Sequence, residues 1–397
     1  MVLGFENLFG QHYEGGANWQ EVTILALGAV AEPPKCLLIG ASPDVLPGSL
    51  RSSALVRAVP LTSPQESPAR ILTKRVLRKV LSRPWEDPKI SIAADEHQIN
   101  LWVGFCGFEG LGAHRPLLVW YPDFQWRHFP ELFSSSELAD RERQWNYIAE
   151  RADGIIVISQ SVGDDGLSSH PQIAEKLHVL GFPPVLDESV LGSDPDETRG
   201  KYNLPRRFLL VCNQFWQHKN HALVLRALSQ LKRCGKVPPV VAFTGHPHDY
   251  RNPDAFGDLL RVVHEEGLND YCRFLGVLPR EEQLALIRVC EAVIQPSRFE
   301  GRGAISEEAT LLGTQLLCSD LPVHRELRVP GAQFFAVDAV EDLAELMTRG
   351  YQKSIRSTED IVRESGHLAI AYGEQFMSIC TRTQAKWLQR MSRLANK

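Results

Sequence analysis

The chain has 397 residues, of which 44% are hydrophobic and 23% charged, and its formal net charge is −5. This length is too great for one compact core and favours two domains of ordinary size. The small negative charge argues against a general nucleic-acid-binding protein, and no apolar run approaches the roughly 20 residues that span a bilayer.

Short apolar runs alternate with helix-like segments in the first half of the chain. Strands are expected at 35–40, 117–121 and 154–159, and a helix at 137–153. This alternation predicts parallel sheets with helices on both faces, as in α/β proteins. The N-terminal residues have neither a basic lead nor a long apolar stretch, so no signal peptide is expected.

A basic segment at 70–83 stands out because it carries no acidic residue. Its basic residues are Arg70, Lys74, Arg75, Arg78, Lys79 and Arg83. Apolar residues share the other side of the expected helix, so the segment can lie on an anionic lipid surface. The alternative is an ordinary helix that packs on a sheet and presents a solvated basic face.

A break near residue 184 divides the chain into two series of strands and helices. Residues 187–200 are acidic and contain glycine and proline, as interdomain linkers do. We predict a first domain at 1–186, a linker at 187–204, a second domain at 205–371 and a C-terminal helix at 372–397.

The most informative motif lies at 296–308. Two carboxylates, Glu300 and Glu308, are separated by seven residues that include a Gly-x-Gly turn. An apolar strand is expected at 292–294, and a helix is expected to start near Glu307. A strand end, a glycine loop and a helix N-terminus together aim backbone N–H groups and a positive dipole end at a ligand. Such a ligand would carry hydroxyls for the carboxylates and a phosphate for the N–H groups.

This arrangement resembles the E-x7-E motif of the retaining nucleotide-sugar glycosyltransferases of family 4, which have the GT-B fold. Other segments are also similar to the family, at 209–220, 240–245, 273–276 and 319–326. The first of these ends in the Lys219-Asn220 pair. Each segment alone is a weak signal, but together they cover about 205–345 in the expected order.

The resemblance implies an α/β protein with two Rossmann-like parallel-sheet domains that face each other across a cleft, with the C-terminal helix crossing back onto the first domain. The donor would bind the second domain and the acceptor mostly the first. The implied reaction transfers a sugar from a nucleotide-diphosphate sugar to a hydroxyl of a glycan or lipid-linked acceptor, with retention, in polysaccharide or glycolipid synthesis. The expected location is the cytoplasm, with a peripheral position on the inner membrane face if the basic segment binds lipid.

The resemblance also assigns roles to residues. Lys219 would contact the donor diphosphate, Glu300 the sugar hydroxyls and Glu308 the ribose hydroxyls. Backbone N–H groups of Gly303, Ala304 and Ile305 would hold the sugar and phosphate. Two further residues, Asn213 and Leu278, complete the donor-binding set in the second domain. On position alone, a lysine such as Lys219 is more often solvated, and an acid near a helix start often only complements the dipole.

The first domain offers fewer candidates. Gly15 and Gly16 precede a helix-like run at 19–27. Because glycine has no side chain, a loop made by this pair can approach the donor phosphates closely. Such a pair is also common in simple turns. Asp123 follows the strand at 117–121 and is a candidate for binding sugar or acceptor, alongside Glu300 and Lys219 as catalytic residues. A loop-capping aspartate is the alternative.

The sequence departs from the family at three places. Asn213-Gln214 stands where an arginine is usual, and Pro122 stands where a histidine is common. Arg302 lies between the two glycines, where it either replaces the missing charge or points to solvent. Two alternative functions remain: a nucleotide-sugar epimerase of the same fold, and a degenerate transferase that serves as a binding subunit.

Metal and thiol chemistry have weak signals. Asp194-Pro195-Asp196 has the D-x-D spacing of metal-dependent glycosyltransferases, but it lies in the expected linker and reads as a turn. The eight cysteines are scattered without Cys-x-x-Cys spacing, which favours reduced structural thiols in a cytosolic setting. We therefore expect no metal and no cofactor besides the nucleotide-sugar substrate.

Overall fold

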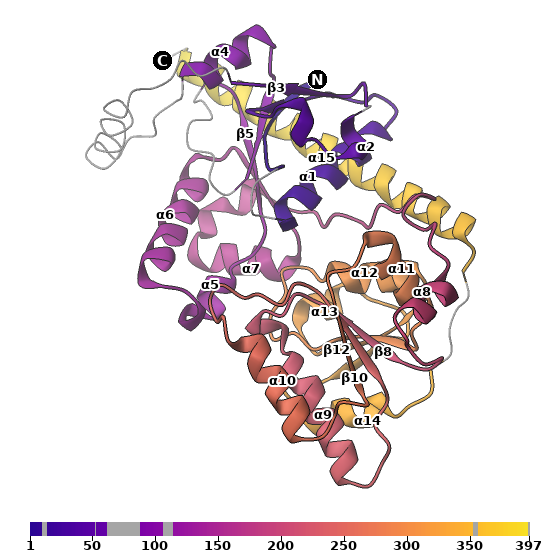
Figure 1. Cartoon of the computed structure of the whole chain (residues 1–397). Coiled ribbons are helices and arrows are strands. Elements are labelled where there is room, and N and C mark those ends of the chain that lie inside the picture. Colours follow the sequence, from indigo (N-terminus) through magenta and orange to yellow (C-terminus); the bar gives the residue numbers. More distant parts are fainter. Residues whose placement is uncertain (10–13, 52, 62–87, 106–113, 352–355, 396–397) are drawn as a thin grey trace.

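The computed structural model describes residues 1–9, 14–51, 53–61, 88–105, 114–351 and 356–395. These residues form two domains, each built on one parallel sheet flanked by helices (Figure 1). The GT-B prediction is therefore confirmed. The basic segment at 70–83 lies outside the described residues.

The first domain contains a seven-stranded sheet in the order β3-β2-β1-β4-β5-β6-β7. Its strands are β1 (Val2–Glu6), β2 (Lys35–Ile39), β3 (Val56–Val59), β4 (Leu101–Gly104), β5 (Leu117–Tyr121), β6 (Gly154–Val157) and β7 (Leu177–Val179). Its helices are α1 (Glu14–Gly28), α2 (Gly48–Arg51), α4 (Pro88–Glu96), α5 (Gln125–His128), α6 (Ser135–Arg151) and α7 (Gln160–Ser169), with 3₁₀ turns η1 (Pro43–Val45), η2 (Pro130–Leu132) and η3 (Pro171–Lys176). Every residue of β4, β5 and β6 is buried, as expected for central strands covered on both faces.

The second domain contains a six-stranded sheet in the order β10-β9-β8-β11-β12-β13. Its strands are β8 (Leu209–Cys212), β9 (Val241–Thr244), β10 (Cys272–Gly276), β11 (Ala292–Gln295), β12 (Gln315–Ser319) and β13 (Gln333–Phe335). Its helices are α9 (His221–Arg233), α10 (Ala255–Glu265), α11 (Arg280–Val289), α12 (Ala304–Leu311), α13 (Pro322–Glu326) and α14 (Val340–Met347), with the 3₁₀ turn η4 (Gln217–Lys219). The strand order reverses between β8 and β11, and ligands of such sheets bind at the carboxyl ends beside that reversal.

The predicted linker contains a helix, α8 (Pro195–Lys201). Asp194 caps it, because its carboxylate accepts from the Glu197 N–H at 2.8 Å and Pro195 occupies the first helical position. Lys201 at its end pairs with Glu282 of α11 at 2.7 Å. The Asp-Pro-Asp segment is thus a helix start rather than the isolated turn expected from the sequence.

Two helix boundaries differ from the prediction at the N-terminal side. Helix α1 begins at Glu14, so Gly15 and Gly16 lie in its first turn instead of preceding the helix. Helix α12 begins at Ala304, three residues before Glu307, because Gly303 adopts the left-handed conformation (φ +98°) that caps it. In α1 the two glycines have low helix propensity and so hide the helix start, whereas α12 starts at a glycine cap that has no capping side chain.

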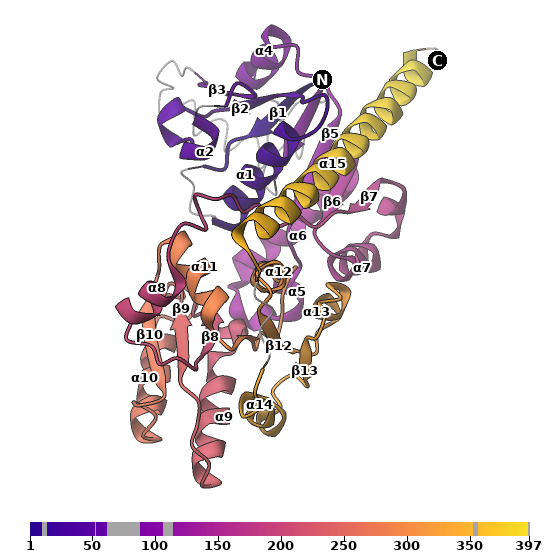
Figure 2. The same ribbon diagram turned by 90° about the vertical axis from the view of Figure 1, so that its right-hand side faces the viewer.

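Helix α15 (Thr358–Ala395) is 38 residues long and runs from the second domain back across the first (Figures 1 and 2). It starts before the predicted boundary at 372. Its early buried positions are Ile361, Ser365 and Ala369, a four-residue spacing whose small polar and apolar side chains gave little hydrophobic signal.

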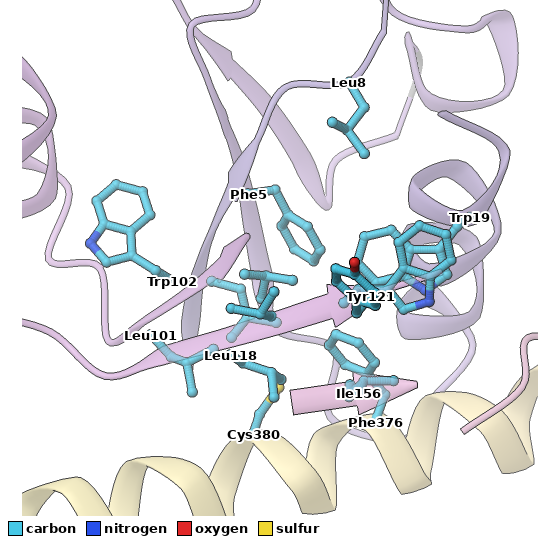
Figure 3. Close-up of a cluster of buried hydrophobic side chains, with 14 of the residues drawn as sticks. Phe5, Leu8, Trp19, Leu101, Trp102, Leu118, Tyr121, Ile156, Phe376 and Cys380 are labelled. Carbon is cyan, nitrogen blue, oxygen red and sulfur yellow. The ribbon is translucent and has the colours of Figure 1, made fainter. Parts of the chain in front are cut away.

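The later part of α15 joins the core of the first domain. Phe376 and Cys380 are fully buried and point toward Leu118 and Ile156 of the sheet (Figure 3). The Tyr372 hydroxyl also shares a buried hydrogen bond of 2.8 Å with the hydroxyl of Thr23 in α1. The C-terminal helix therefore crosses back as predicted.

The described cysteines are all free, and all of them except Cys234 are buried. Burial raises the pKa of the Cys36 thiol to about 12, so it stays protonated as a core residue. Cys106 lies outside the described residues. Within the described chain, no helix combines enough length with enough hydropathy to cross a bilayer.

Candidate functional site

The motif at 296–308 lies beyond the carboxyl end of β11, at the strand-order reversal of the second sheet. Its glycine loop packs against the first domain. A Cβ built on Gly301 would be 2.9 Å from the carbonyl oxygen of Pro122 and 3.2 Å from Cβ of Asp123. Only glycine allows this approach, so the loop brings Asp123 next to the carboxylate motif.

Lys219 and Glu300 form an ion pair at the centre of the site. The Lys219 Nζ lies 2.7 Å and 2.8 Å from the two carboxylate oxygens of Glu300. The side chains are 16% and 8% exposed, respectively, so neither is a solvated surface group. The two residues predicted to hold phosphate and sugar thus also hold each other.

Further side chains orient the Glu300 carboxylate. The Ser297 hydroxyl donates to it at 2.6 Å, and the Gln295 amide lies at 3.5 Å. Gln295 in turn accepts a hydrogen bond from the Asn213 amide. Asn213, where the family usually has arginine, therefore joins the site through Gln295.

The loop that carries Lys219 is fixed by the next residue. Asn220 has the left-handed conformation (φ 57°), which asparagine tolerates better than most residues. Its amide donates to the Pro296 carbonyl at 3.1 Å and to the Asp338 carboxylate at 2.9 Å. The Lys-Asn pair thus consists of one residue that faces Glu300 and one that ties the loop to the end of β11.

The pKa values of Glu300 and Asp123 are shifted in opposite directions. Burial alone would raise the pKa of Glu300, but Lys219 and the Ser297 hydroxyl hold it below its usual range. Burial raises the pKa of Asp123, although the Gln125 N–H donates to its carboxylate at 2.9 Å and Lys219 and Glu300 lie within electrostatic range. Asp123 therefore caps its own loop and also faces the site.

Glu308 and Glu307 have different partners. Glu308 is buried, and the Arg280 guanidinium binds both of its oxygens, at 3.0 Å and 2.6 Å. Glu307 pairs with Arg302 at 2.5 Å. Arg280 lies at the start of α11, just beyond Leu278, which is half-buried after β10.

Arg302 does not point to solvent. Its side chain is 19% exposed, and its Nη1 donates to the Ile158 carbonyl of the first domain at 3.1 Å. Its guanidinium also lies on the backbone of Gly181, where a Cβ would come within 2.1 Å of Cζ. Arg302 therefore connects the two domains through contacts with the first domain and with Glu307.

The start of α12 presents a row of backbone donors. Among the described residues, no acceptor is present for the N–H groups of residues 301–305. They include Gly303, Ala304 and Ile305 and lie at the positive end of the helix dipole. Gly16 lies in the first turn of α1, in the other domain.

These groups suit a ligand with phosphates and hydroxyls. A lysine and aligned N–H donors can hold phosphate oxygens, and the carboxylates can accept from hydroxyls. Within the described chain, no group of three or more histidine, cysteine, aspartate or glutamate side chains has the geometry of a metal site.

Sequence reasoning missed Arg280, Gln295, Ser297 and His324. Ser297 and Gln295 adjoin the motif, so their nearness to Glu300 was a usable signal. Arg280 lies 28 residues before Glu308 on another helix, and no local pattern reports that pairing.

Comparison with known proteins agrees with the fold. Residues 194–364 match the family model of glycosyl transferases group 1. The serotype-specific mannosyltransferase WbdA of Escherichia coli is 25% identical over 260 residues, which cover 61% of this chain and 31% of WbdA. The chain thus spans about a third of the length of this curated relative.

Two solved structures align with nearly the whole chain. Sucrose-phosphate synthase from Thermosynechococcus elongatus has a TM-score of 0.65 and 16% identity, over 99% of this chain and 100% of the synthase chain. HepE (Alr3699) of Anabaena, solved in complex with UDP-glucose, has a TM-score of 0.63 and 18% identity, over 99% and 100% of the two chains. The chain has the GT-B fold, and its second domain matches the glycosyl transferases of group 1.

Proposed function

We propose that this protein is a glycosyltransferase that moves a sugar from a nucleotide-diphosphate sugar to a hydroxyl of a glycan or lipid-linked acceptor in polysaccharide or glycolipid synthesis. The observation that carries the proposal is the buried Lys219–Glu300 pair, which lies at the carboxyl edge of the second sheet and faces Asp123 of the first domain. The match to group 1 glycosyl transferases and the likeness to the mannosyltransferase WbdA support it.

The ion pair suggests how the donor binds. A diphosphate competes with Glu300 for Lys219, and the N–H groups at the start of α12 add further donors. Glu300, released from Lys219, is then free to accept from sugar hydroxyls, while Glu308, oriented by Arg280, accepts from the ribose. In the transition state, Lys219 and the N–H groups stabilise charge on the departing diphosphate.

The first test is a thermal-shift screen of UDP, GDP and ADP and of their sugar conjugates, because tight binding to the folded state raises Tm. Mannose conjugates come first, given the WbdA relatives, followed by UDP-glucose, the ligand of HepE. One nucleotide family should raise Tm, and the best conjugate should be consumed only when an acceptor is added. Turnover without acceptor would favour the epimerase, and binding without any turnover would favour a degenerate binding subunit.

The proposed mechanism retains the anomeric configuration and needs no metal. Lys219 and the N–H donors supply the positive charge that a metal would otherwise supply, so activity should survive EDTA. Proton NMR of the first product should give the donor's anomeric configuration, and Asp123→Asn should lose only part of the activity. An inverted product together with a dead Asp123→Asn would instead identify Asp123 as a general base.

The proposed location is the cytoplasmic face of a membrane, with residues 70–83 in contact with anionic lipid. Vesicles of phosphatidylglycerol should bind the protein at low salt and release it at high salt. Replacing Arg75, Arg78 and Lys79 with glutamate should abolish vesicle binding and leave turnover of a soluble acceptor intact. Equal binding by both proteins would favour an ordinary packed helix.

A further inference from the structure

Two buried polar atoms lie beside Gly303, and neither has a hydrogen-bond partner among the described residues: Nε2 of His324 and Oγ of Ser306. His324 is 1% exposed and Ser306 is fully buried. A Cβ built on Gly303 would lie 3.6 Å from Nε2 and 3.5 Å from Oγ. Both atoms therefore flank one point at the start of α12, inside the candidate donor site. Buried polar atoms are almost always paired, so two unpaired ones at one point indicate a missing partner.

The hydrogen bond of the other ring nitrogen assigns the chemical character of Nε2. Nδ1 of His324 lies 2.8 Å from the Ser319 carbonyl oxygen, which can only accept, so Nδ1 carries the proton. Burial lowers the pKa of His324, against the opposing effect of Glu300, so the ring is neutral at pH 7. Nε2 therefore offers a lone pair and requires a donor.

This requirement separates two kinds of ligand group. A donor phosphate has no proton to give at neutral pH, whereas a hydroxyl donates readily. The Ser306 hydroxyl can donate to the same incoming oxygen that gives its proton to Nε2. A sugar hydroxyl matches both atoms at once.

We propose that Nε2 of His324, together with the Ser306 hydroxyl, binds one hydroxyl of the transferred sugar beside Gly303, and that His324 is thereby a specificity-determining residue of the donor site. This inference rests on the proposed function, since it requires a nucleotide-sugar donor. Both atoms are enclosed by protein, so the sugar must displace a neighbouring side chain to reach them. Glu300 lies within electrostatic range of His324, and we expect it to move when the diphosphate takes its partner Lys219.

The chain allows a matched pair of variants. His324→Asn keeps an amide N–H near the position of Nδ1, where it can still donate to the Ser319 carbonyl, and removes the acceptor at Nε2. His324→Gln places an amide oxygen near the position of Nε2. The comparison thus isolates the acceptor from the ring's structural role.

The experiment measures Kd by calorimetry for GDP and GDP-mannose, or for UDP and UDP-glucose if the wild-type protein prefers uridine. We expect His324→Asn to bind the nucleoside diphosphate within twofold of wild type and to bind the nucleotide sugar about five- to tenfold more weakly. His324→Gln should recover part of that loss, and Ser306→Ala should show a smaller loss of the same kind. Donors that each lack one sugar hydroxyl identify the hydroxyl that binds His324. Removal of that hydroxyl should weaken donor binding to wild type but not to His324→Asn.

Wild-type affinity of His324→Asn for the nucleotide sugar would overturn the inference. So would equal losses for the diphosphate and its sugar conjugate, which would show that His324 only supports the loop. If His324→Asn does not fold, Ser306→Ala with the monodeoxy series decides the same question. A wild-type protein that binds none of the nucleotide sugars would instead overturn the proposed function itself.

Discussion

At the scale of single residues, the Lys219–Glu300 pair is better understood as part of a binding site than as a source of stability. Both side chains are largely withdrawn from water, and such pairs often contribute little net stability because desolvation offsets their attraction. Their value here is that each partner is held in place for a charged ligand. The pair also keeps Glu300 ionised, since Lys219 lowers its pKa.

Removing the Lys219 charge should therefore weaken donor binding and turnover together. A charge-assisted hydrogen bond to phosphate contributes about 1.5–3 kcal/mol, so Lys219→Ala should lower kcat/KM at least about tenfold. Glu300→Gln should mainly lower turnover, and the double variant should lose less than the sum, because the two side chains interact. Lys236, an exposed lysine after α9, is the matched control. Unchanged kinetics in Lys219→Ala would remove Lys219 from the site.

Glu6 at the end of β1 gives a pH-dependent prediction. Its carboxylate accepts from the Phe105 N–H at 3.1 Å, and burial raises its pKa from 4.5 to about 7. Between these values the folded protein holds a proton that the unfolded chain has lost. The free energy of unfolding therefore falls as the pH rises from about 4.5 to 7 and stays lower above it.

Glu6→Gln is neutral at every pH and should remove this loss. We expect the variant to exceed wild type in unfolding free energy at pH 8 by up to about 3 kcal/mol, and by much less at pH 5. Urea denaturation of both proteins at the two pH values measures the difference. The same difference at both pH values would mean that Glu6 does not titrate in this range.

At the scale of elements, two glycines in α15 make opposite predictions. A Cβ on Gly373 would lie 2.5 Å from the Ala26 carbonyl oxygen of α1, whereas a Cβ on Gly366 would meet nothing within 4 Å. Gly373→Ala should therefore push α15 away from α1 and destabilise the protein by about 1–3 kcal/mol. Gly366→Ala should stabilise it by about 0.5–1 kcal/mol, because alanine is the better helix former. Denaturation curves that shift in the same direction for both variants would contradict the packing described here.

The elements also show which features the sequence could predict. The strands β5, β6 and β8 are continuous buried apolar runs, as is β11 up to Ile294, and such runs are visible without a structure. The start of α12 was predicted three residues late, because the cap depends on the backbone conformation of Gly303 rather than on a capping side chain.

Pairing between distant residues was beyond local reasoning. The resemblance assigned Lys219 and Glu300 to one ligand but did not predict their contact across 81 residues. For Arg302 the sequence left open whether it replaces the missing positive charge or points to solvent, and did not predict a contact with the first domain. Its contact with Ile158 depends on how two independently built sheets face each other.

At the scale of the whole molecule, the two domains are held together beside the candidate site. Arg302 donates to the Ile158 carbonyl at 3.1 Å and lies on Gly181. Glu326 of α13 accepts from the Gln160 N–H at 2.9 Å, at the N-terminus of α7, where a carboxylate also complements the helix dipole. Each domain has its own hydrophobic core, so these polar contacts set the relation between the domains more than the stability of either.

Removing the Arg302 side chain should consequently loosen the contact between the two domains without unfolding the protein. We expect Arg302→Ala to raise the radius of gyration in small-angle X-ray scattering and to raise KM for donor and acceptor. The unfolding free energy should fall by about 1–3 kcal/mol, because the largely buried Glu307 loses its partner, but each domain keeps its own core. Arg298→Ala is the control, because Arg298 lies in the same loop but pairs with Asp338 of its own domain at 3.0 Å. An identical radius of gyration in wild type and both variants would show that the carboxylate motif does not depend on Arg302 to meet the first domain. If instead only Arg302→Ala expands, the loop that carries Glu300 is also the loop that positions the two domains for transfer.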